Sequence, residues 1–188
     1  MEKKIILNIK NKIKEGHNLS FIHTPKCAGT YASQYMDFCK IPNKRHNRKN
    51  NDDDITFTII RDPVKRFESF LNYRLEKRSL PKNIQYAVND KKISLDEIIR
   101  KINKIDITSM LYSPYMTLTY WTYDVDLLIT IEELEETLKL LGYNIDNCVF
   151  DKKNISKKER GTLNNESIEK IKKLYEDDVK LYNLWTRK

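Results

Sequence analysis

Apolar runs long enough to cross a membrane are missing from this chain of 188 residues. The apolar part of residues 1–8 is also too short for the hydrophobic region of a signal peptide. No internal repeat, low-complexity tract or linker interrupts the sequence, so a single domain over residues 1–188 is expected. We therefore predict a cytoplasmic protein, either natively cytosolic or trimmed from a longer chain.

Cysteine is scarce, and its three residues show no metal-ligand spacing. The odd number predicts reduced thiols at Cys27, Cys39 and Cys148 in an intracellular protein. The adjacent aspartates at residues 52–54 could bind a cation, but such carboxylates in a polar loop are more often solvated. No metal cofactor is therefore expected.

Basic residues outnumber acidic ones, 35 to 27, which gives a net charge of +8. Hydrophobic residues make up 39% and charged residues 33%, as expected for a globular protein with its own core. The charge predicts anionic partners without choosing among a nucleotide, an anionic glycan, nucleic acid and a membrane surface.

A predicted strand, turn and helix follow one another between residues 19 and 40. The apolar run at residues 19–22 indicates a short buried strand, and a helical pattern begins after the turn. Free N–H groups at a helix start favour a phosphate or sulfate. Lys26 adds a positive charge, Gly29 leaves room for a ligand to approach the backbone, and Thr30 offers a cap and a hydroxyl donor. The predicted anion-binding segment comprises Lys26, Cys27, Ala28, Gly29, Thr30 and Tyr31.

The order of these residues differs from that of a Walker loop, in which lysine follows the second glycine. Here Lys26 precedes Gly29 by three residues. The pattern resembles the 5′-phosphosulfate-binding loop of sulfotransferases that use 3′-phosphoadenosine 5′-phosphosulfate (PAPS), in particular the branch containing the carbohydrate sulfotransferases. The resemblance implies that Lys26 is catalytic and that the loop holds the 5′-phosphosulfate.

A second junction supports the same resemblance. The β-branched and aromatic residues 55–60 predict a buried strand that leads into Arg61, and Asp62 and Pro63 mark a helix start. Arg61 followed eight residues later by Ser69 resembles the family's 3′-phosphate motif. A guanidinium can grip phosphate with two hydrogen bonds, and the hydroxyl adds another. The alternative is a local pairing of Arg61 with Asp62.

The last third carries a looser resemblance. A basic loop at residues 151–161 precedes an expected amphipathic helix over about residues 166–185. In the carbohydrate-type enzymes a similar loop closes over the nucleotide's 3′-phosphate. The resemblance therefore adds four candidate cofactor-binding residues, Lys157, Lys158, Arg160 and Gly161.

The resemblance also implies a position for the general base, because sulfotransferases of this kind often have it in the segment after the first helix. His46 lies there among lysines and arginines. Its unperturbed pKa of roughly 6.5 suits a base near neutral pH. The alternative is a polar excursion whose charges face water. His23, at the end of the first strand, is expected to have a packing or hydrogen-bonding role, with contact to a ligand as the alternative.

The remaining elements complete an α/β pattern, a mostly parallel central sheet flanked by helices. Capping boxes begin helices at Ser94 and at Thr130, Gly142 ends the second of these, and residues 125–131 form another strand. The resemblance adds a P-loop-like nucleotide-binding fold. Residues 1–18 are expected to be a basic lead-in of no assigned structure, and residues 72–93 either an irregular acceptor-side insertion or a solvated basic surface. The aromatic residues 111–121 are either a ligand wall or core packing.

Together these features predict a PAPS-dependent sulfotransferase acting on a hydroxyl, with a carbohydrate favoured over tyrosine or a small phenol. PAPS would be the co-substrate, and the acceptor could be anionic. Two alternatives stay open. One is a module that binds the nucleotide without catalysis, and the other is a basic nucleic-acid-binding protein, for which no recognised motif is present.

Overall fold

The computed structural model describes residues 2–44, 54–76, 94–101, 117–150 and 163–186. The chain divides into two compact units, each built from two separate stretches of sequence. Unit 1 comprises Met1–Arg61 and Leu118–Asn154, and unit 2 comprises Asp62–Thr117 and Ile155–Lys188. Each unit is described by itself.

Unit 1 contains a parallel sheet of three strands in the order β1-β2-β3. The strands are β1 (Asn18–Ile22), β2 (Asp54–Ile60) and β3 (Leu127–Thr130). Phe21 lies opposite Phe57, and Ile60 lies opposite Thr130. The apolar runs read from the sequence are therefore buried parallel strands, and the α/β prediction is confirmed at this level.

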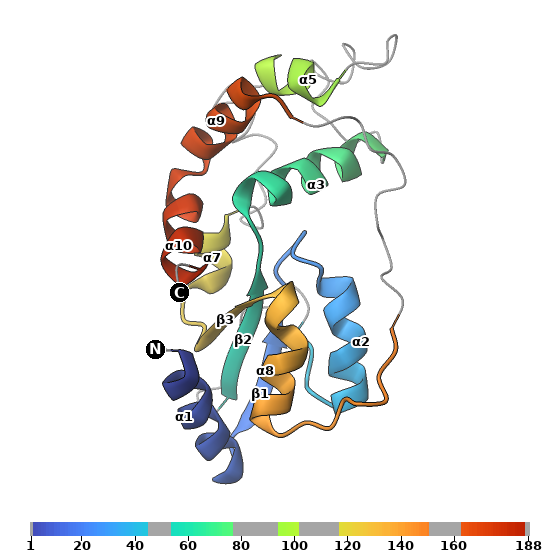
Figure 1. Ribbon diagram of the computed structural model, residues 1–188, viewed down its shortest axis with the longest axis vertical. Helices are drawn as coiled ribbons and strands as arrows, with labels where there is room; N and C mark the ends of the chain where they lie inside the picture. Colours follow the sequence, from blue (N-terminus) through green and yellow to red (C-terminus); the bar gives the residue numbers. More distant parts are fainter. Residues whose placement is uncertain (1, 45–53, 77–93, 102–116, 151–162, 187–188) are drawn as a thin grey trace. The chain divides into compact units, whose positions relative to one another are not determined.

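Helices flank this sheet. They are α1 (Glu2–Lys14), α2 (Gly29–Cys39), α7 (Leu118–Thr122) and α8 (Leu134–Leu141), the last preceded by the 3₁₀ turn η2 (Ile131–Glu133). In Figure 1 the strands rise through unit 1, whereas α2 and α8 begin at the upper end of the sheet and run back down beside it. Both helix starts thus lie at the edge formed by the carboxyl ends of the strands, where open α/β sheets bind ligands.

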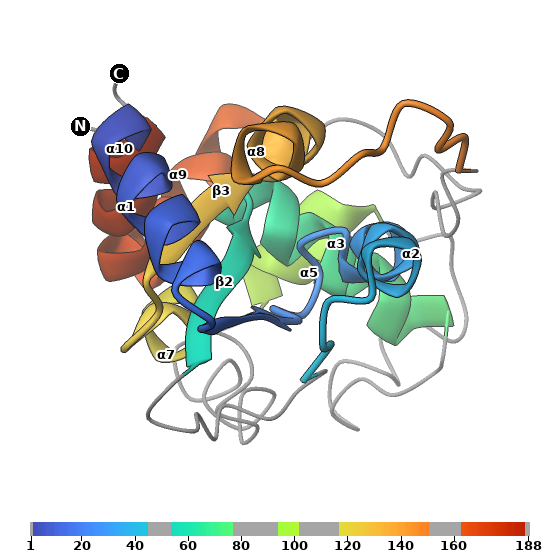
Figure 2. The ribbon, with the colours of Figure 1, turned by 90° about the horizontal axis from the view of Figure 1, so that it is seen from below.

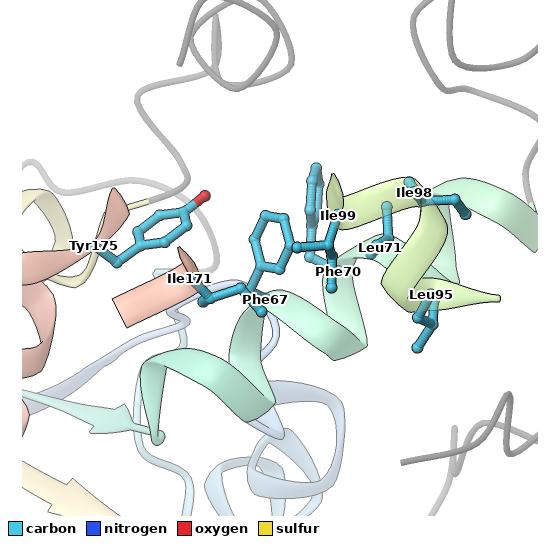
Figure 3. Packing of buried hydrophobic residues seen from close by; sticks show 8 residues of the cluster. All are labelled: Phe67, Phe70, Leu71, Leu95, Ile98, Ile99, Ile171 and Tyr175. Carbon is cyan, nitrogen blue, oxygen red and sulfur yellow. The ribbon is translucent and has the colours of Figure 1, made fainter. Parts of the chain in front are cut away.

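Unit 2 is helical in the residues described. It comprises α3 (Pro63–Glu76), α5 (Leu95–Lys101), α9 (Asn165–Leu174) and α10 (Glu176–Thr186). Figure 3 shows its apolar cluster, in which side chains of α3 and α5 meet those of α9 and the residue after it. The cluster consists of Phe67, Phe70, Leu71, Leu95, Ile98, Ile99, Ile171 and Tyr175.

The helix starts agree with their sequence signals. Asp62 Oδ1 accepts the amide of Lys65 at 2.9 Å, so Asp62 caps α3. Ser94 and Glu97 exchange the two hydrogen bonds of a capping box, and so do Thr130 and Glu133. These signals predict well because a cap involves residues only three apart.

The structure differs from or refines three of the expected elements. Residues 2–14 form α1, seen beside α8 in Figure 2, because Ile6 and Ile9 bury an apolar face. Residues 72–76, expected to be irregular, continue α3, and residues 77–93 are not among the described residues. The expected helix over 166–185 is two helices that meet at Tyr175, whose φ of −116° and ψ of 36° break the helical path.

No helix in these described ranges combines the length and the apolar composition that a bilayer crossing requires.

Candidate functional site

The β1–α2 loop, residues 23–28, has an unusual backbone. Lys26 and Ala28 have φ values of 66° and 59°, in the left-handed region that favours glycine. Such a conformation costs roughly 1–2 kcal/mol for a non-glycine residue. Strain of this kind persists where the surrounding structure maintains it, and functional loops are a common place for it.

The loop ends in a group of free amides. Ala28 occupies the N-cap position of α2, and an alanine side chain cannot accept a hydrogen bond there. Among the described residues, the N–H groups of Ala28, Gly29 and Thr30 have no acceptor. Left-handed residues beside a helix start turn successive N–H groups toward one point, and this arrangement binds oxyanions.

Thr30 follows the cap instead of providing it, so that part of its predicted role is wrong. It is the second residue of α2, and its side chain is exposed. Its hydroxyl has no hydrogen-bond partner in the described chain. The hydroxyl is therefore available to donate to a ligand beside the free amides.

Gly29 has a different role from the predicted one. A Cβ at this position would overlap the imidazole ring of His23, so the space beside Gly29 is filled by protein. The same ring stacks on Phe21 with 6.3 Å between ring centroids. His23 therefore packs between β1 and the start of α2, and Gly29 is needed for that close approach.

Two threonines fasten the start of the loop to the sheet. Thr58 Oγ1 donates to the Ile22 carbonyl at 2.7 Å, which uses its only proton. Thr24 Oγ1 lies 2.6 Å from Thr58 Oγ1 and must therefore be the donor of that pair. Neither threonine was identified from the sequence. Their only signal is that each lies at or near the carboxyl end of a parallel strand.

Cys27 turns inward. Its side chain is buried, and its amide donates to the Thr24 carbonyl at 3.3 Å. The Cys27 N–H already has an acceptor and is therefore not available to bind an anion. Cys27, Cys39 and Cys148 form no disulfide in the part of the chain that the structure describes, and burial raises the pKa of the Cys39 thiol.

Arg61 reaches the loop from the end of β2. Its guanidinium donates to the carbonyl of Lys26, with 3.3 Å between Nη1 and O. The side chains of Lys26 and Arg61 are both half-buried. Two cationic residues that lie far apart in the sequence therefore come from neighbouring strand ends to the same loop.

Ser69 lies on α3 and belongs to unit 2, whereas Arg61 is the last residue of the first stretch of unit 1. Its side chain is half-buried. The pairing of Arg61 with Ser69 remains a prediction from sequence spacing.

Tyr31, predicted as a cofactor-binding residue, has both of its donors in use. Its amide donates to the Ala28 carbonyl at 2.9 Å. Its hydroxyl lies 3.0 Å from that of Tyr35, which in turn donates to the Glu135 carboxylate. Tyr35 and Glu135 were not identified from the sequence, since nothing local links positions 100 residues apart.

Several predicted site residues fall outside the described ranges. They are His46, Lys157, Lys158, Arg160 and Gly161. In the aromatic stretch, residues 111–116 are likewise not described, while Trp121 is fully buried and packs in the core of unit 1. Within the ranges that are described, no three His, Cys, Asp or Glu side chains are grouped as a metal ion requires.

Comparisons with protein-family models, with curated proteins and with solved structures found no match for this chain.

Proposed function

We propose that this chain is a PAPS-dependent sulfotransferase that transfers a sulfuryl group to a hydroxyl of an acceptor, with carbohydrate as the favoured acceptor class. The observation that carries the proposal is the loop after β1. There, the amides of Ala28, Gly29 and Thr30 have no acceptor among the residues that the structure describes, the Thr30 hydroxyl is exposed, and Arg61 contacts the backbone of Lys26 in the same loop. The corresponding fold would be a P-loop-like sulfotransferase domain.

The chemistry requires an in-line displacement at sulfur. The acceptor oxygen forms the new S–O bond, the bond to the bridging oxygen breaks, and 3′,5′-adenosine bisphosphate leaves. Catalysis of such transfers depends on positioning and on stabilising charge at the leaving group. The amides of Ala28, Gly29 and Thr30 would hold the 5′-phosphate, and Lys26 would neutralise charge at the bridging oxygen.

The 3′-phosphate distinguishes PAPS from other adenine nucleotides. Arg61 and Ser69 are assigned to it, with Lys157, Lys158, Arg160 and Gly161 closing over it. Arginine has five N–H donors, of which one binds the Lys26 carbonyl. The remaining donors suffice for a phosphate. His46 is the sequence-based candidate for the base that receives the hydroxyl proton.

The test uses PAPS labelled with ³⁵S and a panel of carbohydrate, phenol and peptide acceptors. We expect transfer to a carbohydrate hydroxyl. Lys26→Gly should abolish most of this turnover, by roughly two to three decades, because the cation acts on charge that develops in the transition state. The same variant should fold at least as stably as wild type, since glycine adopts a φ of 66° without strain.

The control is Lys65→Gly, which removes an exposed cation from the first turn of α3 and should leave turnover unchanged. Binding of labelled PAPS without transfer to any acceptor would reduce the assignment to a nucleotide-binding module. Oligonucleotide binding that the bisphosphate does not block would favour a nucleic-acid-binding protein instead.

A further inference from the structure

A chain of hydrogen bonds runs from α2 to α8 inside unit 1. Tyr31 Oη lies 3.0 Å from Tyr35 Oη, and Tyr35 donates to Glu135 Oε1. The two tyrosine rings meet edge to face, with 5.4 Å between their centroids. Tyr35 is only 2% exposed, whereas the Glu135 side chain is exposed.

The direction of this chain follows from counting protons. A phenol has one proton, and an ionised carboxylate only accepts. Tyr35 donates its proton to Glu135, so the proton between the two tyrosines must belong to Tyr31. The Tyr31 oxygen therefore keeps only lone pairs for a further partner. It can accept a hydrogen bond from a hydroxyl, but it has no proton to offer a phosphate.

Burial keeps Tyr35, the middle residue of the hydrogen-bond chain, in its neutral form. Burial raises the pKa of the Tyr35 phenol well above its usual range, and the hydrogen bonds to Glu135 and Tyr31 raise it further. The ring of Phe150 closes another side of Tyr35, with 4.8 Å between ring centroids. Tyr35 thus stays protonated and can pass a proton on only by accepting one from Tyr31 at the same time.

The two ends of the hydrogen-bond chain, Tyr31 and Glu135, lie in different surroundings. Tyr31 lies in the first turn of α2, directly after the free amides, and helical side chains lean toward the N-terminus of their helix. This lean favours a position of the Tyr31 hydroxyl on the side of the β1–α2 loop. Glu135 lies in the first turn of α8, after β3, at the same edge of the parallel sheet.

A wide, open depression of the surface, about 470 Å³ in volume, lies beside Glu135. It is lined by residues of η2 and α8, namely Glu132, Glu135, Glu136, Lys139 and Leu140. The carboxylate thus combines an internal hydrogen bond from Tyr35 with access to water. It can release a proton that arrives through the chain.

We propose that Tyr31, Tyr35 and Glu135 form a proton relay that deprotonates the acceptor hydroxyl during sulfuryl transfer, an inference that rests on the proposed function. As the acceptor oxygen bonds to sulfur, its proton passes to the Tyr31 oxygen. The Tyr31 proton moves to Tyr35, and the Tyr35 proton moves to the Glu135 carboxylate and then to water. Each phenol gains one proton and loses one, and the bisphosphate leaves with the electrons of the broken S–O bond.

The experiment measures kcat at saturating PAPS and acceptor for Tyr31→Phe, Tyr35→Phe and Glu135→Gln in the full chain. Each variant should lose roughly two decades or more, the usual contribution of a positioned base. The melting-temperature shift caused by the bisphosphate should stay as in wild type. Glu136→Gln is the matched control, because Glu136 lines the same depression but belongs to a different part of the helix surface from the Tyr35 contact.

Two further readouts separate a relay from a simple structural tie between α2 and α8. Combining Tyr31→Phe with Glu135→Gln should cost little more than either change alone, because both interrupt one path. The wild-type solvent deuterium isotope effect on kcat should fall in both single variants. A lower melting temperature with unchanged kcat and isotope effect would show a structural tie and overturn the relay.

His46→Ala completes the comparison. Turnover that survives His46→Ala but is lost in Tyr31→Phe supports the relay. Turnover that is lost in His46→Ala and retained in Tyr31→Phe overturns the relay and leaves the proposed function intact. If the wild-type protein binds PAPS but transfers no sulfuryl group, the proposed function itself is wrong. Failure of the relay and failure of the proposed function can therefore be told apart.

Discussion

The guanidinium of Arg61 is hydrogen-bonded to the backbone carbonyl of Lys26, with 3.3 Å between Nη1 and O. Lys26 is one of two left-handed residues in its loop, and Arg61 ends the neighbouring strand region after β2. One side chain therefore holds the left-handed part of the β1–α2 loop and retains further N–H donors. Changes at Arg61 should affect both the loop and nucleotide recognition.

Replacing Arg61 should remove selectivity for the 3′-phosphate. In wild type, 3′,5′-adenosine bisphosphate should raise the melting temperature far more than AMP or ATP, because a ligand that binds only the folded state stabilises it by mass action. Arg61→Ala should remove most of the difference between bisphosphate and AMP. Arg61→Lys should restore little of it, since an ammonium cannot form the two-pronged contact. Equal stabilisation of wild type by AMP and bisphosphate would contradict the role assigned to Arg61.

Gly29 and His23 should show strong coupling in a double-mutant cycle. Gly29→Ala places a methyl group where the His23 ring lies, and overpacking of this kind typically costs about 1–3 kcal/mol. In a His23→Ala background the ring is gone, so the same change should be neutral or stabilising by up to about 1 kcal/mol. Urea unfolding of the four proteins measures the coupling. An equal cost of Gly29→Ala in both backgrounds would show that the clash is not its cause.

Asp178 is expected to contribute far more to the free energy of unfolding than the adjacent Asp177. Its carboxylate lies 3.7 Å from the Arg66 guanidinium, and both side chains are almost fully buried, at 2% and 3% exposure. Asp178→Ala would leave a buried cation without this partner, a loss that costs about 3–5 kcal/mol. Asp177→Ala changes the adjacent aspartate, which is 84% exposed, and should alter stability by no more than about 0.5 kcal/mol. Similar unfolding midpoints for the two variants would rule out a stabilising role for the buried pair.

Tyr175 should make the protein lose stability in alkaline solution. Burial raises the pKa of its phenol well above the usual range, Arg66 opposes the shift and Asp178 adds to it. Its hydroxyl has no hydrogen-bond partner among the described residues. Above a pH of about 10 the unfolded chain loses this proton while the folded chain keeps it. The stabilisation is therefore complete below that pH and is lost as the pH rises toward the folded-state pKa, by up to about 1.4 kcal/mol per pH unit.

Tyr175→Phe is the variant that checks this linkage. Phenylalanine keeps the ring in the apolar cluster and removes the ionisable hydroxyl. The pH dependence of the unfolding free energy between pH 9 and 11 should become shallower. Tyr35, whose pKa is also raised, should retain part of the slope. An unchanged slope in Tyr175→Phe would show that other groups produce the alkaline transition.

Local signals in the sequence identified much of the fold. Asp62, Ser94 and Thr130 each mark a helix start, and each makes the hydrogen bond or capping box expected of it. Gly142 ends α8 with a φ of 103°, as its position after the helical pattern indicated. Such interactions connect residues within one turn of helix, so the sequence order alone brings their partners together.

The break at Tyr175 had no local signal. The sequence there contains no proline or glycine, and its apolar spacing is compatible with one continuous helix. Tyr175 packs on Phe67, with 5.5 Å between ring centroids, while Asp178 pairs with Arg66. Both partners lie on α3, about a hundred residues earlier, so tertiary packing decides where the helical path changes.

The sequence by itself determined where the β1–α2 loop lies, because a buried strand, a lysine-containing turn and a helix start are adjacent along the chain. Only the tertiary structure decided what surrounds that loop. Arg61 on Lys26, Thr58 beside Thr24, and Glu135 at the end of the tyrosine chain are contacts between strand ends or helix starts far apart in sequence. Parallel strands bring their carboxyl ends to one edge of a sheet, and which side chains meet there depends on strand register, which no local pattern encodes.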